Sequence, residues 1–182
     1  AFMTTRFWYQ SMTNLERLPN YRDALERHAR QVCQAGVEIS VNGISDKWFK
    51  SHMPTEMYRY AYAKHLIQHE VIGICRRAEA QGCDAVILGS FSEPFLGEIR
   101  SLLDIPVIGM AESSMLLACT LGEQFSLVAM GPAQLVRLRH VIDGHGLGNR
   151  IREIVTLDHP VHEKELDAAL KDPQAVMANF SS

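Results

Sequence analysis

The chain has 182 residues, of which 47% are hydrophobic and 21% are charged, with a formal net charge of -3. This composition is typical of one folded domain, or of two small ones that share a core, and excludes an intrinsically disordered chain. The acidic balance argues against a nucleic-acid partner, since general nucleic-acid binders carry an excess of basic side chains.

The first part of the chain alternates between strand and helix patterns. Apolar runs predict strands, and apolar residues three or four positions apart predict helices. In chain order, we predict a strand at 4–10, a helix at 21–35, a strand at 37–42, a long helix from Thr55 to Gly82, a strand at 84–89, a helix from Pro94 to Leu103 and a strand at 106–109. Thr55 is the expected cap of the long helix, and Pro94 suits the first turn of the next one.

The alternation continues to the end of the sequence. The predicted elements are a helix at 113–121, a strand at 125–130, a helix at 134–143, a strand at 151–157 and short helical stretches near 163–170 and 173–180. Regular alternation of strand and helix indicates an α/β fold with Rossmann-like parallel sheets and flanking helices.

Small and polar residues gather where four predicted strands end. They are Gln10, Ser11, Thr13 and Asn14 after the first strand, 89–93 after the third, 109–114 after the fourth and 130–132 after the fifth. In open parallel sheets, ligands bind beyond the carboxyl ends of the strands. Hydroxyls and backbone N–H groups at helix starts suit a small anion, such as a carboxylate or an imide.

Each of these residues also has a purely structural interpretation. Ser11 and Ser113 can serve only as helix caps, and we hold both interpretations equally open. Glu112 stabilises the first turn of a helix without any catalytic role, and glycines at strand ends permit tight turns. The shared position of the set favours a site more than any single residue does.

The histidines and the 43–54 segment are weaker indications. His65 and His69 share a helix face, but the Glu of the H-E-x-x-H motif is missing, so we predict no metal site. His159 and His162 form a loop pair without a third ligand nearby in sequence. The segment 43–54, with Trp48 and Phe49, is either a lid over the pocket or a surface loop.

Cysteine spacing and hydropathy indicate in which cellular compartment the protein is expected. The four cysteines are Cys33, Cys75, Cys83 and Cys119, and no two have C-x-x-C spacing, so reduced, buried thiols are expected. Apolar runs such as 85–88 and 115–119 are too short for a membrane span. The first residues lack the pattern of a signal peptide, and we expect a cytoplasmic protein without a membrane partner.

The stretch 82–130 resembles a known family. Its second half, IPVIGMAESSMLLA (105–118), is similar to the I-P-V-x-G-x-x-E-A-x-M pattern of the hydantoin racemase branch of the Asp/Glu racemase superfamily. The loop Gln10-Ser11-Met12-Thr13 looks like the family's first substrate-binding loop, and the similarity extends to 146–151.

The resemblance implies two pseudo-symmetric Rossmann-like lobes, which we place at 1–110 and 111–182. It implies proton transfer at an acidic Cα of a small-molecule substrate by two cysteines, with no cofactor or metal, in a homo-oligomer. Ser90 then takes the catalytic position. The substrate-binding residues are Gln10, Ser11, Thr13, Phe91, Glu112, Ser113 and Gly131.

This sequence departs from the family pattern in both cysteines. Ser90 stands where the first is expected, and a serine hydroxyl is a poor proton acceptor at neutral pH unless a base lies beside it. The second falls beyond Ser182, and we expect the natural chain to continue there.

The expected function is therefore that of a racemase or isomerase-like enzyme acting on an amino-acid derivative, a hydantoin-like imide or a small carboxylate. One alternative is a binding protein that has kept the pocket and lost the acid/base pair. Others are a decarboxylase-like lyase that uses one thiol, and a hydrolase or lyase with Ser90 as the nucleophile.

Overall fold

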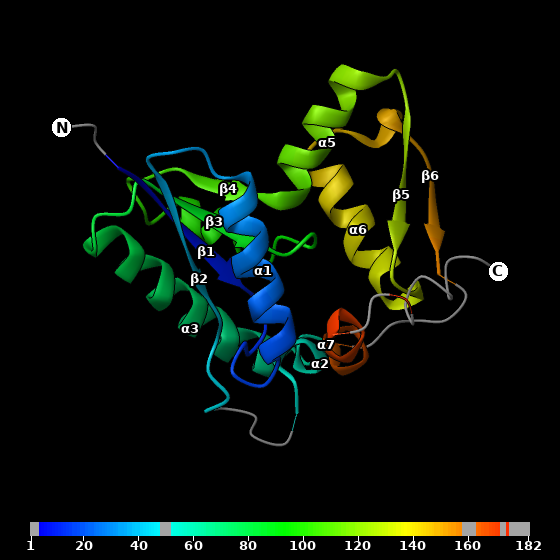
Figure 1. Cartoon of the computed structure of the whole chain (residues 1–182). Coiled ribbons are helices and arrows are strands. Elements are labelled where there is room, and N and C mark those ends of the chain that lie inside the picture. The colour runs from blue at the N-terminus through cyan, green and yellow to red at the C-terminus, as the bar shows by residue number, and fades with distance from the viewer. Residues whose placement is uncertain (1–3, 48–51, 158–162, 172–173, 175–182) are drawn as a thin grey trace. The chain divides into compact units, whose positions relative to one another are not determined.

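The computed structural model of the chain describes residues 4–47, 52–157, 163–171 and 174. Trp48, Phe49, His159, His162 and most of the predicted helix at 173–180 lie outside the described residues. The chain divides into two compact units, Ala1–Gly109 and Met110–Ser182, and each is considered by itself (Figure 1). None of the helices in the described part of the chain has the length and hydropathy that a membrane span requires.

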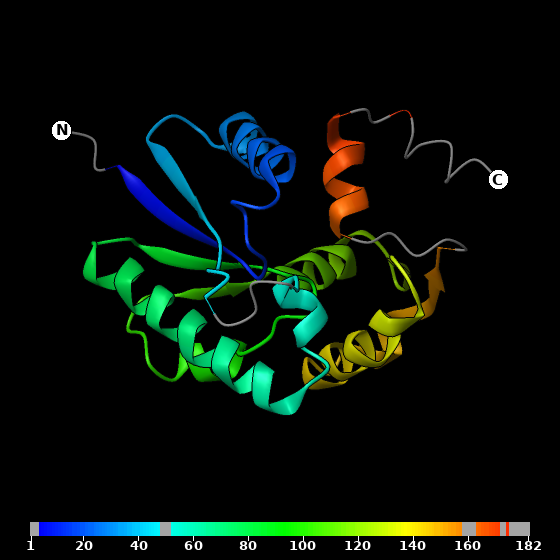
Figure 2. The ribbon, with the colours of Figure 1, turned by 90° about the horizontal axis from the view of Figure 1, so that it is seen from below.

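The first unit contains a parallel sheet of four strands in the order β2-β1-β3-β4. The strands are β1 (Thr5–Ser11), β2 (Val37–Asn42), β3 (Ala85–Gly89) and β4 (Val107–Gly109). Helix α1 (Pro19–Val32) lies on one face, and α3 (Ala61–Ala80) lies on the other (Figure 2). Two short helices complete the unit, α2 (Pro54–Met57) and α4 (Leu96–Arg100).

The core of this unit lies between the sheet and α3. Helix α3 buries Ile67, Val71 and Ile74, at the three- and four-residue spacing that places them on one helix face. They pack in one cluster with Val86 and Leu88 of β3. The apolar run of β3 is thus explained by burial, as parallel strands covered by helices require.

The long helix predicted between Thr55 and Gly82 is divided in two. Tyr60, with φ -98° and ψ 120°, is extended and separates α2 from α3. Pro54 opens α2, and the Glu56 carboxylate accepts a hydrogen bond of 2.9 Å from the Met53 N–H, so Thr55 is not the cap. The break lies beside a tertiary contact, since the Tyr58 ring packs against buried Phe95 with centroids 6.0 Å apart.

The prediction of a helix that begins at Pro94 is also wrong. Helix α4 begins at Leu96 because Glu93 (φ 41°) and Phe95 (φ 68°) are left-handed and cannot belong to a right-handed helix. Of the two leucines assigned to the helix end, Leu103 is buried but Leu102 is exposed. The segment from Ser90 to Phe95 is therefore a shaped loop.

The second unit contains two parallel strands, β5 (Phe125–Ala129) and β6 (Ile151–Thr156). Its helices are α5 (Met110–Leu121), α6 (Pro132–Gly144) and α7 (Glu163–Lys171), with a 3-10 turn at Gly148–Arg150. The Arg150 guanidinium donates hydrogen bonds of 2.7 to 2.9 Å to the carbonyls of Cys119, Gly122 and Glu123. It thereby satisfies backbone acceptors at the end of α5.

All six predicted strands are confirmed to within one residue at each end, and so is the α/β class. Helix α5 begins three residues before the predicted start, directly after β4, and Pro132 takes the first position of α6.

Candidate functional site

The carboxyl edge of the four-stranded sheet brings two predicted loops together. Ser11, the last residue of β1, pairs in register with Gly89, the last residue of β3. Leu88 in turn pairs with Gly109, the last residue of β4. The loop that follows Ser11 and the loop that contains Ser90 and Phe91 therefore leave adjacent strands at the same edge.

Gln10 is fully buried and both ends of its amide are occupied by the protein. Its Oε1 accepts a hydrogen bond of 3.1 Å from Trp8 Nε1, and its Nε2 donates one of 2.9 Å to the Ser11 carbonyl. These bonds hold the end of β1 in place. The predicted contact of Gln10 with substrate stays a prediction.

Thr13 carries the least satisfied polar group of this edge. The residue is only 5% exposed, and its Oγ1 has no hydrogen-bond partner within the described residues. An unpaired buried hydroxyl costs roughly 1 to 3 kcal/mol, so it calls for a reason. The loop itself is well held, since the Ile44 N–H donates a hydrogen bond of 3.0 Å to the Thr13 carbonyl.

Ser90 lies half-buried at the start of the β3 loop, in contact with a second hydroxyl. The Ser90 and Ser92 Oγ atoms are 3.0 Å apart, and the Ser92 N–H donates a bond of 3.4 Å to Ser90 Oγ. The Glu93 N–H donates to the Ser90 carbonyl at 3.1 Å, which closes the turn. Ser90 is thus a hydroxyl in a tight loop, with a second hydroxyl as neighbour.

Two further residues lie at this edge, Tyr9, which was not predicted from sequence, and Glu93, which was predicted only as a member of the polar stretch 89–93. The Tyr9 ring covers Gly89 so closely that a Cβ at that position would overlap it. Burial raises the pKa of the Tyr9 hydroxyl far above its usual range, and the nearby Tyr21 raises it further. Tyr9 therefore stays protonated. Only the positions of Gly89 and Gly109 hinted at such close neighbours.

The other predicted site residues lie in the second unit. Glu112 is in the first turn of α5, and its Oε1 lies 3.5 Å from His145 Nδ1. Ser113 is exposed, and Gly131 is buried immediately before α6. Their contribution to a substrate site stays a prediction.

The capping interpretation of Ser11 and Ser113 is wrong. Helix α1 follows Leu18 rather than Ser11, and Ser113 is already the fourth residue of α5.

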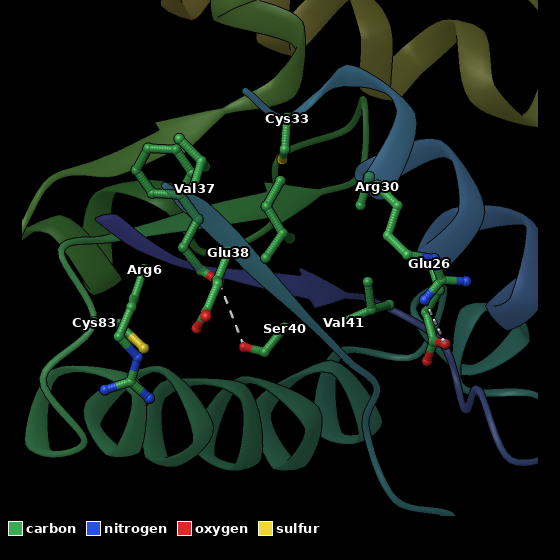
Figure 3. Close-up of a pocket in the computed structure, with 12 residues that line it drawn as sticks. Arg6, Glu26, Arg30, Cys33, Val37, Glu38, Ser40, Val41 and Cys83 are labelled. Carbon is green, nitrogen blue, oxygen red and sulfur yellow. Dashed lines mark hydrogen bonds and ion pairs between the residues drawn. The ribbon is translucent and has the colours of Figure 1, made fainter. Parts of the chain in front are cut away.

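A cavity of about 480 Å³ lies elsewhere in the first unit, beside the edge strand β2 (Figure 3). Its lining includes Phe7, Val37 and Ile39 together with the Glu26–Arg30 pair of α1, whose charged atoms are 3.8 Å apart. Helix α1 buries no side chain completely, which leaves this space between helix and sheet. None of the predicted site residues is among the described residues that line it.

The described residues contain no group of three or more side chains placed to bind a metal. The four cysteines are free thiols, two of them buried, Cys75 and Cys83. Burial raises the pKa of the Cys75 thiol to about 12, with Arg77 opposing the shift. Cys75 is therefore an unreactive core thiol, as expected from the sequence.

Comparison with known proteins identifies relatives that together cover most of the chain. The model of the Asp/Glu/Hydantoin racemase family matches residues 20–181. A hydantoin racemase of Pseudomonas sp. (strain NS671) is 32% identical over 114 residues, covering 63% of this chain and 44% of the relative. A hydantoin racemase of Paenarthrobacter aurescens is 30% identical over 137 residues, covering 75% of this chain and 57% of the relative. The chain thus spans about half the length of these curated relatives.

Solved structures show the same fold. Allantoin racemase from Klebsiella pneumoniae superposes with a TM-score of 0.68 at 24% identity, covering 97% of this chain and 70% of that one. Allantoin racemase from Pseudomonas fluorescens gives a TM-score of 0.71 at 20% identity, covering 96% of this chain and 68% of that one.

Proposed function

Because the chain belongs to the Asp/Glu/hydantoin racemase family, we propose that it transfers protons at the acidic Cα of a hydantoin-like cyclic imide or a related amino-acid derivative. The observation that carries this proposal is the buried Thr13 hydroxyl, which has no hydrogen-bond partner in the described part of the chain and follows β1 at the edge where the Ser90 loop begins. We propose that a small shift of the loop after β1 turns the Thr13 hydroxyl to a ligand carbonyl, and the hydrogen bond formed then offsets the cost of burying it.

In the proposed reaction, Ser90 Oγ accepts a hydrogen bond from a hydroxide ion of the solvent, which takes the Cα proton and becomes water. The C–H electron pair moves into the adjacent carbonyl and makes an enolate oxygen. The Ser90 and Thr13 hydroxyls donate hydrogen bonds to that developing negative charge. Return of a proton to Cα completes the exchange, and return to the opposite face inverts the centre. The imide carbonyl itself accepts the electron pair, so we propose a reaction without a cofactor.

We also keep three expectations from the sequence as part of this proposal. The two compact units correspond to the pseudo-symmetric lobes at 1–110 and 111–182, and the protein forms a homo-oligomer. Glu112, Ser113 and Gly131 are kept as substrate-binding residues, as the sequence predicts.

Exchange in heavy water tests the reaction directly. We expect the protein to incorporate deuterium at Cα of at least one 5-substituted hydantoin, measured by mass spectrometry and by loss of optical rotation. Ligand-induced thermal stabilisation without exchange across a panel of hydantoins and amino-acid derivatives would instead indicate the binding protein considered above. Absence of both would remove the proposed substrate class.

Replacement of Thr13 by valine is expected to move stability and substrate binding in opposite directions. Valine has the shape of threonine without the hydroxyl, so losing an unpaired buried group should raise the free energy of unfolding by about 1 kcal/mol. Loss of the hydrogen bond to substrate should raise KM by about tenfold. Urea unfolding and exchange kinetics measure the two effects. A variant that is less stable with unchanged KM would show that the hydroxyl has a partner within the protein.

A further inference from the structure

Glu93 stands out in the Ser90 loop because it is a buried charged residue. It is only 7% exposed, and among the described residues it is the one charged side chain classed with the core. Burying a carboxyl group is costly unless the surrounding structure compensates for it. Its position three residues after Ser90 suggests a use in the site.

The Glu93 carboxyl group lies directly against the backbone of the neighbouring strand. A Cβ placed on Gly109 would be 2.7 Å from the Glu93 Cδ and 3.2 Å from the Leu96 Cδ2. Any side chain at position 109 would therefore displace the carboxyl group. Since Gly109 pairs in register with Leu88, this contact ties the loop after β3 to the end of β4.

The backbone around Glu93 needs such support. Glu93 and Phe95, on either side of Pro94, have φ of 41° and 68°, a region that residues other than glycine rarely adopt. Conformations of this kind persist only where the surrounding structure holds them. Phe95 is held by its buried ring against Tyr58, and Glu93 by its contact with Gly109.

We propose that Glu93 is a positioning residue for Ser90, acting through the contact of its buried carboxyl group with Gly109. The Glu93 N–H bond to the Ser90 carbonyl, 3.1 Å long, transmits the position of Glu93 to Ser90. The inference depends on the proposed function only for its effect on activity. Its effect on the position of residue 90 stands independently.

A reporter at position 90 tests the positioning without a substrate. In a Ser90→Cys background, we compare Glu93→Ala, Gly109→Ala and the double variant, and follow alkylation of the introduced thiol by iodoacetamide with peptide mass mapping. The matched control is Gly97→Ala, since Gly97 is exposed in α4 and a Cβ there meets nothing within 4 Å.

We expect Glu93→Ala and Gly109→Ala each to release the loop and to raise the alkylation rate by about tenfold, with little change in Gly97→Ala. The two changes should not add, because alanine at 109 displaces a side chain that Glu93→Ala has already removed. Glu93→Gln keeps the shape of the side chain, so its increase in alkylation rate should be at most half of the increase in Glu93→Ala. In the protein that retains Ser90, Glu93→Ala should lower kcat for exchange by about tenfold with KM nearly unchanged.

These outcomes separate the two proposals. Alkylation rates in Glu93→Ala and Gly109→Ala within twofold of the parent overturn the positioning role, whatever the activity. The same conclusion follows if the two changes add, or if Glu93→Gln behaves like Glu93→Ala. Faster, non-additive alkylation in a protein that shows no exchange supports the positioning of residue 90 and overturns the proposed function instead. If Glu93→Ala fails to fold, Glu93→Asp, with its shorter reach to Gly109, serves in its place.

Discussion

Replacement of Ser90 by cysteine should raise the rate of Cα proton exchange by about a hundredfold, while replacement by alanine should lower it by about a hundredfold. A thiol has an ordinary pKa near 8.5, so a few per cent is thiolate at neutral pH and accepts a proton directly. The serine hydroxyl stays protonated and acts only through a hydrogen bond. Alanine removes that bond altogether.

Deuterium incorporation into a hydantoin, measured as kcat and KM for each variant, checks this prediction. Ser101, whose exposed hydroxyl donates a 2.7 Å bond to the Glu98 carbonyl at the end of α4, provides matched controls as Ser101→Ala and Ser101→Cys. If Ser90→Ala and Ser101→Ala behaved alike, Ser90 would have no part in the reaction. If the Ser90→Cys protein exchanged the Cα proton more slowly than the parent, the thiol at position 90 would not be the better proton acceptor that this prediction assumes.

Replacement of Gly89 by alanine is expected to lower the free energy of unfolding by about 3 kcal/mol, the upper end of the range for overpacking a core. The added methyl group would overlap the Tyr9 ring, whose hydroxyl is hydrogen-bonded to the Tyr21 side chain, so that the ring cannot easily move away. At Gly73 in α3, a Cβ meets nothing within 4 Å. Alanine there should instead raise the free energy of unfolding by up to about 1 kcal/mol, because alanine has the higher helix propensity.

Urea unfolding of the two alanine variants measures this contrast. A further variant, Gly89→Ala combined with Tyr9→Ala, identifies the neighbour responsible, because removal of the ring should make alanine at 89 nearly neutral relative to Tyr9→Ala alone. Equal effects at positions 89 and 73 would mean that the Tyr9 ring does not restrict position 89.

Much of the architecture could be predicted from residue patterns alone. Strand β3 is a short apolar run because it is buried in the interior of the sheet, whereas the edge strand β2 alternates between apolar and polar residues. The meeting of the loops after Ser11 and Gly89 also followed, because parallel strands end at the same edge. The similarity of 105–118 to a family motif indicated the racemase family that the match over residues 20–181 confirms.

Some site residues could be predicted from the sequence, and others are recognised only in the folded structure. Thr13 and Ser90 were predicted because polar residues after apolar runs are visible in the sequence. Tyr9 was not, since it lies within a strand, and Glu93 was included only as one member of the polar stretch 89–93, without a role of its own, because it resembles an ordinary helix start before α4. Their importance depends on glycines of other strands, Gly89 and Gly109, which lie against them only in the folded chain.

The sequence by itself thus determined the α/β class, the strand positions and the edge at which the polar loops meet, because these depend on local periodicity and on burial of whole elements. Only the tertiary structure decided the break between α2 and α3 and the left-handed residues around Pro94. It also decided which side chains press against Gly89 and Gly109. These features arise where contacts between distant residues outweigh local backbone preference, and beyond the glycines at the strand ends no local pattern identifies the residues in contact.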